Sequence, residues 1–169
     1  SRPEVRWRVR PSAYAAAVPE HLRLLVVAAI VGGGLVTGLL FAFSLVVMRA
    51  LRELPAATGM AAMQRINVLI VNPLFLALFL GTALLSAGLA VVALRGLPAP
   101  GAAWLLAGAL LYLLGPLGVT VAFNVPLNNR LAGAAASEAD AVWPAYVVAW
   151  LRWNHLRTVI GAAGIAALA

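Results

Sequence analysis

The sequence contains no cysteine, and this absence removes several kinds of site at once. Without a thiol it offers no disulfide, no thiolate metal site and no cysteine nucleophile. Acidic residues are also scarce: the five are Glu4, Glu20, Glu53, Glu138 and Asp140. Histidine occurs only twice. Because haem or copper needs several ligating side chains, we expect no metal and no bound cofactor.

Lysine is absent as well, so all twelve basic residues are arginines, which stay protonated. Five of them lie in or just after the first 21 residues: Arg2, Arg6, Arg8, Arg10 and Arg23. We interpret residues 1–21 as a basic tail that contacts lipid headgroups or sets orientation, so nucleic acid is not an expected partner. We do not expect a signal peptide there, because no short apolar region with a cleavage site follows these arginines.

Charged residues make up only 10% of the chain, whereas 64% of it is hydrophobic and the mean hydropathy is +1.00. Soluble domains are roughly half apolar and about a quarter charged. A water-soluble core of this size cannot hide so much apolar surface, so lipid must cover most of it. We therefore predict an all-α integral membrane protein, with a four-helix transmembrane bundle over residues 22–169.

Four segments are expected to cross the bilayer, which takes about 20 residues each. They are residues 22–48, 68–94 and 104–123, and a last helix that begins near Trp143-Pro144. The last helix must include a polar turn, because its purely apolar part is shorter than a span. We predict short interfacial helices in the first and third connections. Since spans alternate in direction, these two connections lie on the same side.

Polar side chains gather in and beside these two connections. They comprise four asparagines, Asn67, Asn72, Asn124 and Asn128, and five residues of the last helix, Trp150, Trp153, Asn154, His155 and Arg157. Polar groups at membrane depth are costly unless they pair or face water. Trp150, Trp153, Asn154 and Arg157 recur at steps of three and four residues, which predicts a shared inward face.

A purely structural interpretation of these residues is open. Asparagines can satisfy backbone groups that Pro73 and Pro126 leave free, tryptophans can belong to an interfacial belt, and arginines can snorkel to the headgroups. The functional interpretation is a pocket with an aromatic wall, amides and one or two guanidinium groups. Such a pocket suits a flat lipophilic molecule with carbonyl or phenolic oxygens. Serine-triad, phosphate-loop and dinucleotide motifs are missing, which argues against classical hydrolases and kinases.

Several strings carry a resemblance to a known family. They are Met63-Gln64-Arg65-Ile66-Asn67, Asn72-Pro73-Leu74-Phe75, Phe123-Asn124-Val125-Pro126-Leu127-Asn128 and Trp153-Asn154-His155-Leu156-Arg157-Thr158, with Trp143 and Trp150. From about Leu22 onward, the chain resembles the anthrone oxygenase-like family of small four-helix membrane proteins. Fungal relatives oxidise an anthrone to an anthraquinone with O2, without a metal or flavin. The resemblance places the chain as a multi-pass protein of a bacterial inner membrane.

The resemblance implies a cofactor-independent membrane oxygenase or oxidase of an anthrone- or quinol-like substrate. An imidazole titrates near neutral pH, so His155 is the candidate base, and Arg157 is the candidate partner of an oxyanion. Asn154 completes the catalytic set. The remaining polar residues are expected to bind substrate: Asn67, Asn72, Asn124, Asn128, Trp150 and Trp153.

A non-catalytic function is the alternative. A membrane protein of this composition can also bind a lipid or quinone, or serve as a small subunit of a larger complex. Four glycines in the first span, Gly32, Gly33, Gly34 and Gly38, fit close helix packing in such an assembly. The expected partners are thus the bilayer and a lipophilic small molecule, and a homo-oligomer or a larger membrane complex is left open.

Overall fold

The computed structural model describes residues 19–169, so the predicted basic tail lies outside the described residues except for its last three positions. The described part consists of five continuous helical segments joined by short connections, and it contains no strand. An all-α fold is therefore confirmed.

The first long helix runs through three elements without interruption: α1 (Glu20–Ala42), η1 (Phe43–Val47) and α2 (Met48–Arg52). Together they span 33 residues, which corresponds to about 50 Å. The predicted first span lies within this helix. In η1 the hydrogen bonding is π-helical, which widens the helix locally.

The second span begins later than predicted. The helix α3 (Ala56–Leu69) ends before Asn72, and α4 (Pro73–Gly96) starts at the proline. Proline lacks a backbone donor and disfavours helical geometry at the residue before it, so Asn72 is extended, with φ −116° and ψ 159°. The prediction that residues 68–72 belong to the second span is wrong for this reason.

The third helix is continuous from Ala102 to Ala132, through α5 (Ala102–Tyr112), η2 (Leu113–Asn124) and α6 (Val125–Ala132). Gly115 and Pro116 lie in the π-helical stretch, and the chain stays helical through the proline. After a single 3-10 turn, η3 (Ala136–Glu138), α7 runs from Ala139 to Leu168. It starts before the predicted Trp143-Pro144, and Pro144 lies inside it.

Three of the described helices are long and apolar enough to cross a membrane: Glu20–Arg52, Pro73–Gly96 and Ala102–Ala132. This marks the chain as a membrane protein. The predicted fourth span, α7, is long enough, but the polar turn from Arg152 to Arg157 lowers its hydropathy. Its crossing, and an interfacial place for α3, stay predictions.

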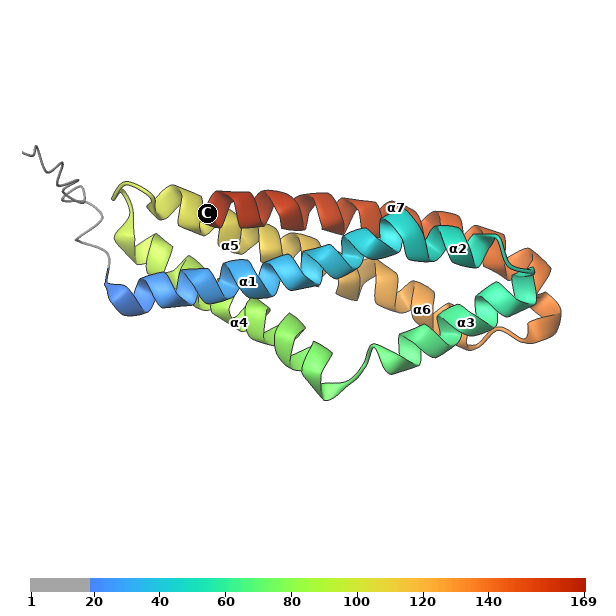
Figure 1. Ribbon diagram of the computed structural model, residues 1–169. Coiled ribbons are helices and arrows are strands. Elements are labelled where there is room, and N and C mark those ends of the chain that lie inside the picture. Colours follow the sequence, from blue (N-terminus) through green and yellow to red (C-terminus); the bar gives the residue numbers. More distant parts are fainter. Residues whose placement is uncertain (1–18) are drawn as a thin grey trace, which may run out of the picture.

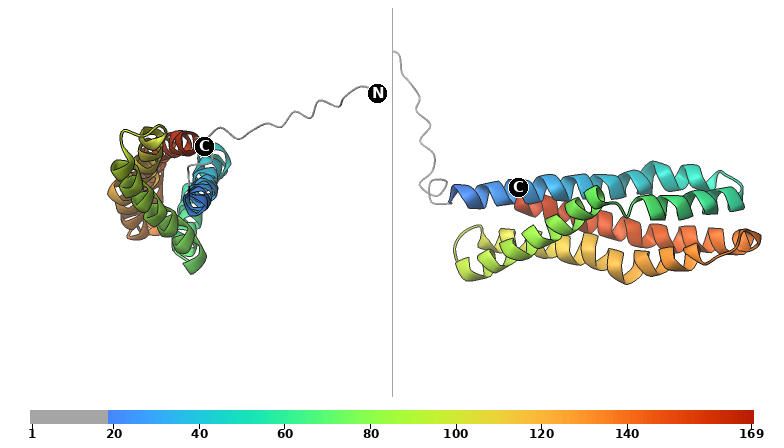
Figure 2. Two further views of the ribbon diagram at one scale, coloured as in Figure 1. Left: turned by 90° about the vertical axis from the view of Figure 1, so that its left-hand side faces the viewer. Right: turned by 90° about the horizontal axis from the view of Figure 1, so that it is seen from below.

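The connections α2–α3 and α6–α7 lie at one end of the molecule, and the α4–α5 connection lies at the other end with the start of α1 (Figures 1 and 2). The two polar connections therefore share one end, as predicted. The helices α3 and α4 diverge from the remaining helices and meet in an elbow, Ile70–Asn72, that projects from the bundle (Figure 1).

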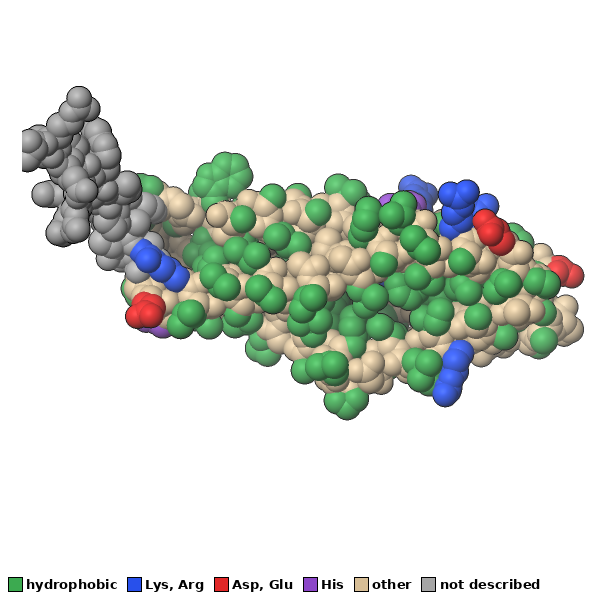
Figure 3. Space-filling view, viewed as in Figure 1, with side chains coloured by type: hydrophobic (Ala, Val, Ile, Leu, Met, Phe, Trp, Pro, Cys, Tyr) green, Lys and Arg blue, Asp and Glu red, His purple; other side chains and the backbone are tan. Residues whose placement is uncertain are grey.

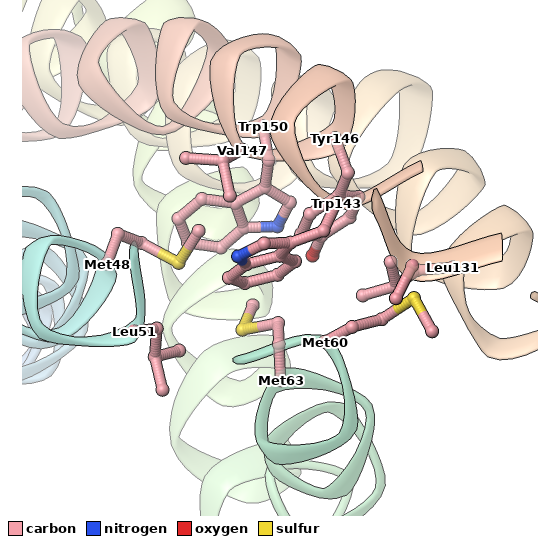
Figure 4. Close-up of a cluster of buried hydrophobic side chains, with 10 residues drawn as sticks. Met48, Leu51, Met60, Met63, Leu131, Trp143, Tyr146, Val147 and Trp150 are labelled. Carbon is pink, nitrogen blue, oxygen red and sulfur yellow. The ribbon is translucent and has the colours of Figure 1, made fainter. Parts of the chain in front are cut away.

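The core is divided into three clusters along the bundle. Ala29, Leu89 and Ala109 mark the cluster among α1, α4 and α5, and Val36, Phe79 and Tyr112 mark the middle one. The third cluster joins α2, α3, α6 and α7 (Figure 4); it contains all three methionines, Met48, Met60 and Met63, with Trp143, Tyr146 and Trp150. The polar site described next lies between the middle and third clusters.

Two of the four predicted packing glycines do face a neighbouring helix. A side chain at Gly32 would clash with Thr82 of α4, and one at Gly33 would contact Tyr112 and Ile165. Gly34 and Gly38 have open space around them, so neither packs against another helix of this bundle, and a role in packing against another chain stays a prediction. Glycines also let α7 pack closely on its neighbours: a Cβ at Gly164 would lie 3.1 Å from Leu111 of α5, and one at Gly161 would lie 2.9 Å from Pro116 of η2.

Candidate functional site

Asn154 of α7 is completely buried and bonds to the widened turn at the end of α1. Its Nδ2 donates to the carbonyl oxygen of Leu40 at 2.8 Å and to Ser44 Oγ at 2.7 Å. In a π-helical turn the backbone N–H groups bond to carbonyl oxygens five residues earlier, not four. This shift leaves room for a side chain to bond to a backbone carbonyl oxygen of the helix. Asn154 thus ties α7 to η1.

Arg157 lies one turn beyond Asn154 and is only 7% exposed. Its Nε and Nη2 donate to Asn154 Oδ1 at 3.0 and 2.7 Å, and its Nη1 donates to Thr120 Oγ1 of η2 at 2.6 Å. The guanidinium carbon lies 5.3 Å from the centre of the Trp150 ring, a cation–π distance. Every protein partner of this buried cation is neutral.

No carboxylate compensates Arg157 among the described residues, where the only ion pair joins Arg49 to Glu53. A guanidinium has five N–H groups, and the bonds above use three of them. One N–H on each terminal nitrogen is therefore left for another acceptor. A buried cation without a counter-charge is costly, which makes this position a candidate binding site for an anion.

An aromatic and amide wall continues from Arg157 toward the polar end of the molecule. Asn128 Oδ1 of α6 accepts hydrogen bonds from Trp150 Nε1 at 3.0 Å and from the Tyr146 hydroxyl at 2.9 Å. Phe43 of η1 packs against Trp150, with ring centres 5.7 Å apart. Residues from η1, α6 and α7 thus meet around one indole ring.

Two amide atoms near this wall are buried without a hydrogen-bond partner. Asn124 is 1% exposed; its Nδ2 donates to the Trp150 carbonyl oxygen at 3.4 Å, whereas its Oδ1 is unpaired. Asn67 of α3 lies beside the Tyr146 hydroxyl, and its Nδ2 is unpaired. Unsatisfied buried polar atoms are rare and costly in native proteins. One is an acceptor and the other a donor, so together they suit a ligand that carries both kinds of group.

His155 does not point into this cluster. Its side chain is exposed, and its Nδ1 lies 2.9 Å from Ser44 Oγ, the same hydroxyl that accepts from Asn154. The imidazole therefore reaches the buried groups only through Ser44. This geometry gives the predicted base no direct place beside Arg157.

Two further predicted residues lie elsewhere. Trp153 stacks on Phe123 with ring centres 3.6 Å apart and is partly exposed, so it does not share the inward face of Trp150. Asn72 is exposed and caps α4: its Oδ1 accepts from the backbone N–H of Phe75 at 3.0 Å, and its Nδ2 donates to the Leu69 carbonyl oxygen at 2.9 Å. For Asn72 the structural interpretation accounts for both ends of the amide.

Four residues of the site were not predicted from sequence: Phe43, Ser44, Thr120 and Tyr146. Ser44 and Thr120 are 110 and 37 positions away from the residues they bond, so no local spacing marks them. Tyr146 does precede Trp150 by four residues on α7, and that spacing could have placed it on the same face.

The surface around the site is apolar. Figure 3 shows hydrophobic side chains over this face of the molecule, which is hollowed between α1 and the diverging α3 and α4. At the elbow, Val68, Val71 and Leu74 are 63%, 65% and 81% exposed, so the rim of the hollow is suited to hydrocarbon. A separate apolar groove of about 370 Å³ lies farther along α4, against Leu25 of α1.

No metal site competes with this interpretation in the part of the chain that is described, because no three His, Asp or Glu side chains gather there. The chemistry available to the site is that of amides, hydroxyls, indole rings and one buried guanidinium. Groups of these kinds are able to bind and polarise the oxygen atoms of a ligand.

Comparison with known families decides the membership. The sequence model of a family described as anthrone oxygenase matches residues 74–167, more than half of the 169 residues. The chain belongs to the anthrone oxygenase family. The match includes α4 through α7 and so contains Thr120, Asn124, Asn128, Asn154 and Arg157. Comparison with curated proteins and with solved structures gave no match.

Proposed function

We propose that this member of the anthrone oxygenase family is a cofactor-independent membrane oxygenase that oxidises a lipophilic anthrone- or quinol-like substrate with O2. The observation that carries the proposal is Arg157, a buried cation held only by neutral groups beside an indole ring. A cation preorganised in this way stabilises negative charge that develops on a bound oxygen atom.

The remaining groups fit a flat aromatic ligand. Its rings can pack near Trp150 and Phe43, since offset aromatic contacts are favourable. Its oxygen atom would accept from the two free N–H groups of Arg157. Other oxygen substituents would pair with the unsatisfied Asn124 Oδ1 and Asn67 Nδ2, which removes the cost of leaving those atoms buried and unpaired.

The reaction needs no redox group from the protein. An anthrone has a methylene opposite its ketone, and loss of one methylene proton leaves an anthrolate whose charge lies largely on the ketone oxygen, beside Arg157. The anthrolate passes one electron to O2, and the resulting carbon radical and superoxide combine into a hydroperoxide anion. Protonation and loss of water then give the quinone. One oxygen atom enters the product, the other leaves as water, and the substrate supplies all four electrons.

Access from the bilayer suits such a substrate. The hollow between α1 and the elbow faces outward among exposed apolar side chains, and we infer that a molecule dissolved in lipid enters from this side without crossing water. A dry site also strengthens the interaction between Arg157 and an oxyanion.

The decisive experiment is oxygen uptake with unsubstituted anthrone by purified protein in nanodiscs, corrected for spontaneous oxidation. Arg157→Leu should reduce the protein-dependent rate about 100- to 1000-fold, the usual effect of losing an oxyanion partner. Arg152→Leu is the matched control, because Arg152 is an exposed arginine on the same helix. Equal rates in folded Arg157→Leu and wild-type protein would contradict the proposal.

The non-catalytic alternative makes a different forecast for the same samples. A quinone or lipid binder would quench tryptophan fluorescence saturably on adding ligand under argon, with no protein-dependent oxygen uptake in air. That pair of results would replace the oxygenase function with a binding function at the same residues.

A further inference from the structure

We propose that Ser44 and His155 form the proton outlet of the site, in which the Ser44 hydroxyl passes the substrate's proton outward to the His155 imidazole. This inference rests on the oxygenase function proposed above. It assigns a role to a serine that neither the family match nor the sequence motifs include, because residues 74–167 do not contain Ser44.

The direction of the hydrogen bonds follows from what each atom can do. The amide Nδ2 of Asn154 can only donate, so Ser44 Oγ, at 2.7 Å, accepts from it. The hydroxyl hydrogen of Ser44 is then free to point at His155 Nδ1, at 2.9 Å. For Nδ1 to accept it, the neutral ring must carry its own hydrogen on Nε2.

Burial changes from one end of this chain of contacts to the other. Asn154 is 0% exposed, Ser44 is partly buried and His155 is exposed. Asn154 and His155 are consecutive on α7, so their side chains point about 100° apart around the helix. Ser44, which comes from a different helix, is the described group that bonds to both of them.

The π-helical segment η1 sets the place of Ser44. Within it the hydrogen-bond ladder of the first helix is shifted, and Asn154 donates to Leu40 in addition to Ser44. Phe43, the residue before Ser44, packs against Trp150. The same short segment therefore contributes both an aromatic contact to the substrate wall and the hydroxyl that leads out of it.

The proton balance closes without any electron transfer. The substrate loses one proton to Ser44 Oγ while the hydroxyl hydrogen of Ser44 moves to His155 Nδ1. Ser44 ends unchanged, His155 becomes an imidazolium, and the substrate becomes an anion beside Arg157. The imidazolium then releases a proton from its exposed ring to solvent. Two positive groups thus flank the new negative charge until the proton leaves.

The test separates proton removal from oxidation by excluding oxygen. Under argon in D2O, the protein should catalyse the exchange of the methylene hydrogens of anthrone for deuterium. NMR measures the rate of this exchange. Ser44→Ala and His155→Ala should each slow the protein-dependent exchange about 100-fold, within the usual range for general base catalysis. Ser44→Thr keeps a hydroxyl and should retain most of the rate. His21→Gln and Ser137→Ala are controls, since both alter exposed residues of the same types elsewhere.

Rescue of the exchange rate by added imidazole distinguishes a proton relay from a merely structural role of His155. Because His155 is exposed, free imidazole should restore exchange in His155→Ala by replacing the missing ring beside Ser44. Free imidazole should not restore the exchange rate of Ser44→Ala, because this variant lacks the hydroxyl between substrate and base. Thermal unfolding of both variants checks that they are folded.

The two proposals fail separately in this design. Unchanged exchange in folded Ser44→Ala or His155→Ala, or equal imidazole rescue of both variants, overturns the relay even if wild-type protein consumes oxygen. A wild-type protein that catalyses no exchange also overturns it. Protein-dependent exchange that needs Ser44, without any oxygen uptake in air, overturns the oxygenase function and leaves the relay standing.

Discussion

The carboxamide oxygen of Asn154 accepts two hydrogen bonds from Arg157, from Nε at 3.0 Å and from Nη2 at 2.7 Å. An amide orients the guanidinium as a carboxylate would, but it leaves the positive charge uncompensated. The charge is therefore available to a ligand, and the pair acts as an oriented cation inside an apolar bundle.

Asn154→Asp should remove the uncompensated positive charge of Arg157. A carboxylate at 154 would neutralise Arg157, because two opposite unit charges about 4 Å apart attract by about 4 kcal/mol at an effective dielectric constant of about 20. Affinity for an anionic ligand such as a phenolate should fall more than tenfold, measured under argon by tryptophan fluorescence. Asn129→Asp, which changes an exposed asparagine, is the control. Unchanged affinity in Asn154→Asp would show that ligands do not use Arg157.

Trp150 and Trp153 should differ in their response to ligand. Trp150 is buried and packs against both Arg157 and Phe43, whereas Trp153 stacks on Phe123 at the surface of the bundle. Trp150→Phe should remove most of the ligand-dependent quenching of fluorescence and weaken binding. Trp153→Phe should leave both nearly unchanged. Equal effects of the two substitutions would move the binding site away from Trp150.

Asn124→Leu should weaken ligand binding without lowering stability, because Asn124 Oδ1 serves binding and not folding. Asn124 Oδ1 is buried without a partner, so replacing the amide by a similarly sized apolar side chain should leave the unfolding free energy unchanged or raise it, within about 1 kcal/mol. Binding of a hydroxylated anthrone should weaken by up to about tenfold, since one hydrogen bond contributes about 1 kcal/mol. Binding of unsubstituted anthrone should not change. A large loss of stability would identify Asn124 as structural.

Gly161→Ala should destabilise the bundle, and Gly34→Ala should not. A Cβ at Gly161 would lie 2.6 Å from Thr37 Oγ1 and 2.9 Å from Pro116 Cγ, and the proline ring cannot rotate away. Overpacking of this kind costs about 1–3 kcal/mol. Gly34 has no heavy atom within 4 Å of such a Cβ, so alanine there is neutral or stabilising through helix propensity. Thermal unfolding in one detergent compares the two variants.

The direction of α7 through the membrane can be measured with introduced cysteines, because the chain has none of its own. Ser137→Cys and Leu54→Cys should react with an impermeant maleimide from one side of sealed vesicles. Ala99→Cys and Ala169→Cys should react from the other side if α7 crosses. If Ala169→Cys reacts from the same side as Ser137→Cys, the chain crosses only three times.

The sequence was informative where the relevant distances are local. Asn154 and Arg157 are three residues apart on one helix, so their contact could be predicted from helix geometry alone. Relative to Trp150, Asn154 is rotated by about 40° and Arg157 by about 20°, which keeps them on one narrow face. Trp153 is about 60° away on the edge, and His155 about 140° away, which explains why neither faces inward.

Partners from other helices could not be predicted in the same way. Ser44 and Thr120 both lie in π-helical segments, where the regular 100° step per residue no longer holds. Counting about 100° per residue through a π-helical segment therefore places every later side chain of that helix on the wrong side. For Asn72 the sequence left a capping role and a binding role open, and the hydrogen bonds of its amide favour the cap, because an asparagine before a proline can satisfy the end of its own helix.

The π-helical segment η1 also gives the first long helix one residue to spare. A π-helical turn closes hydrogen bonds from i to i+5, so it holds about one residue more than an α-helical turn. Removing one residue from Phe43–Val47 and returning the ladder to α-helical bonding would therefore leave Met48 and Leu51 facing Trp143, but it would straighten the turn from which Ser44 meets Asn154. Such a deletion would separate the packing of the two halves of the helix, which survives, from the polar contact with α7, which does not.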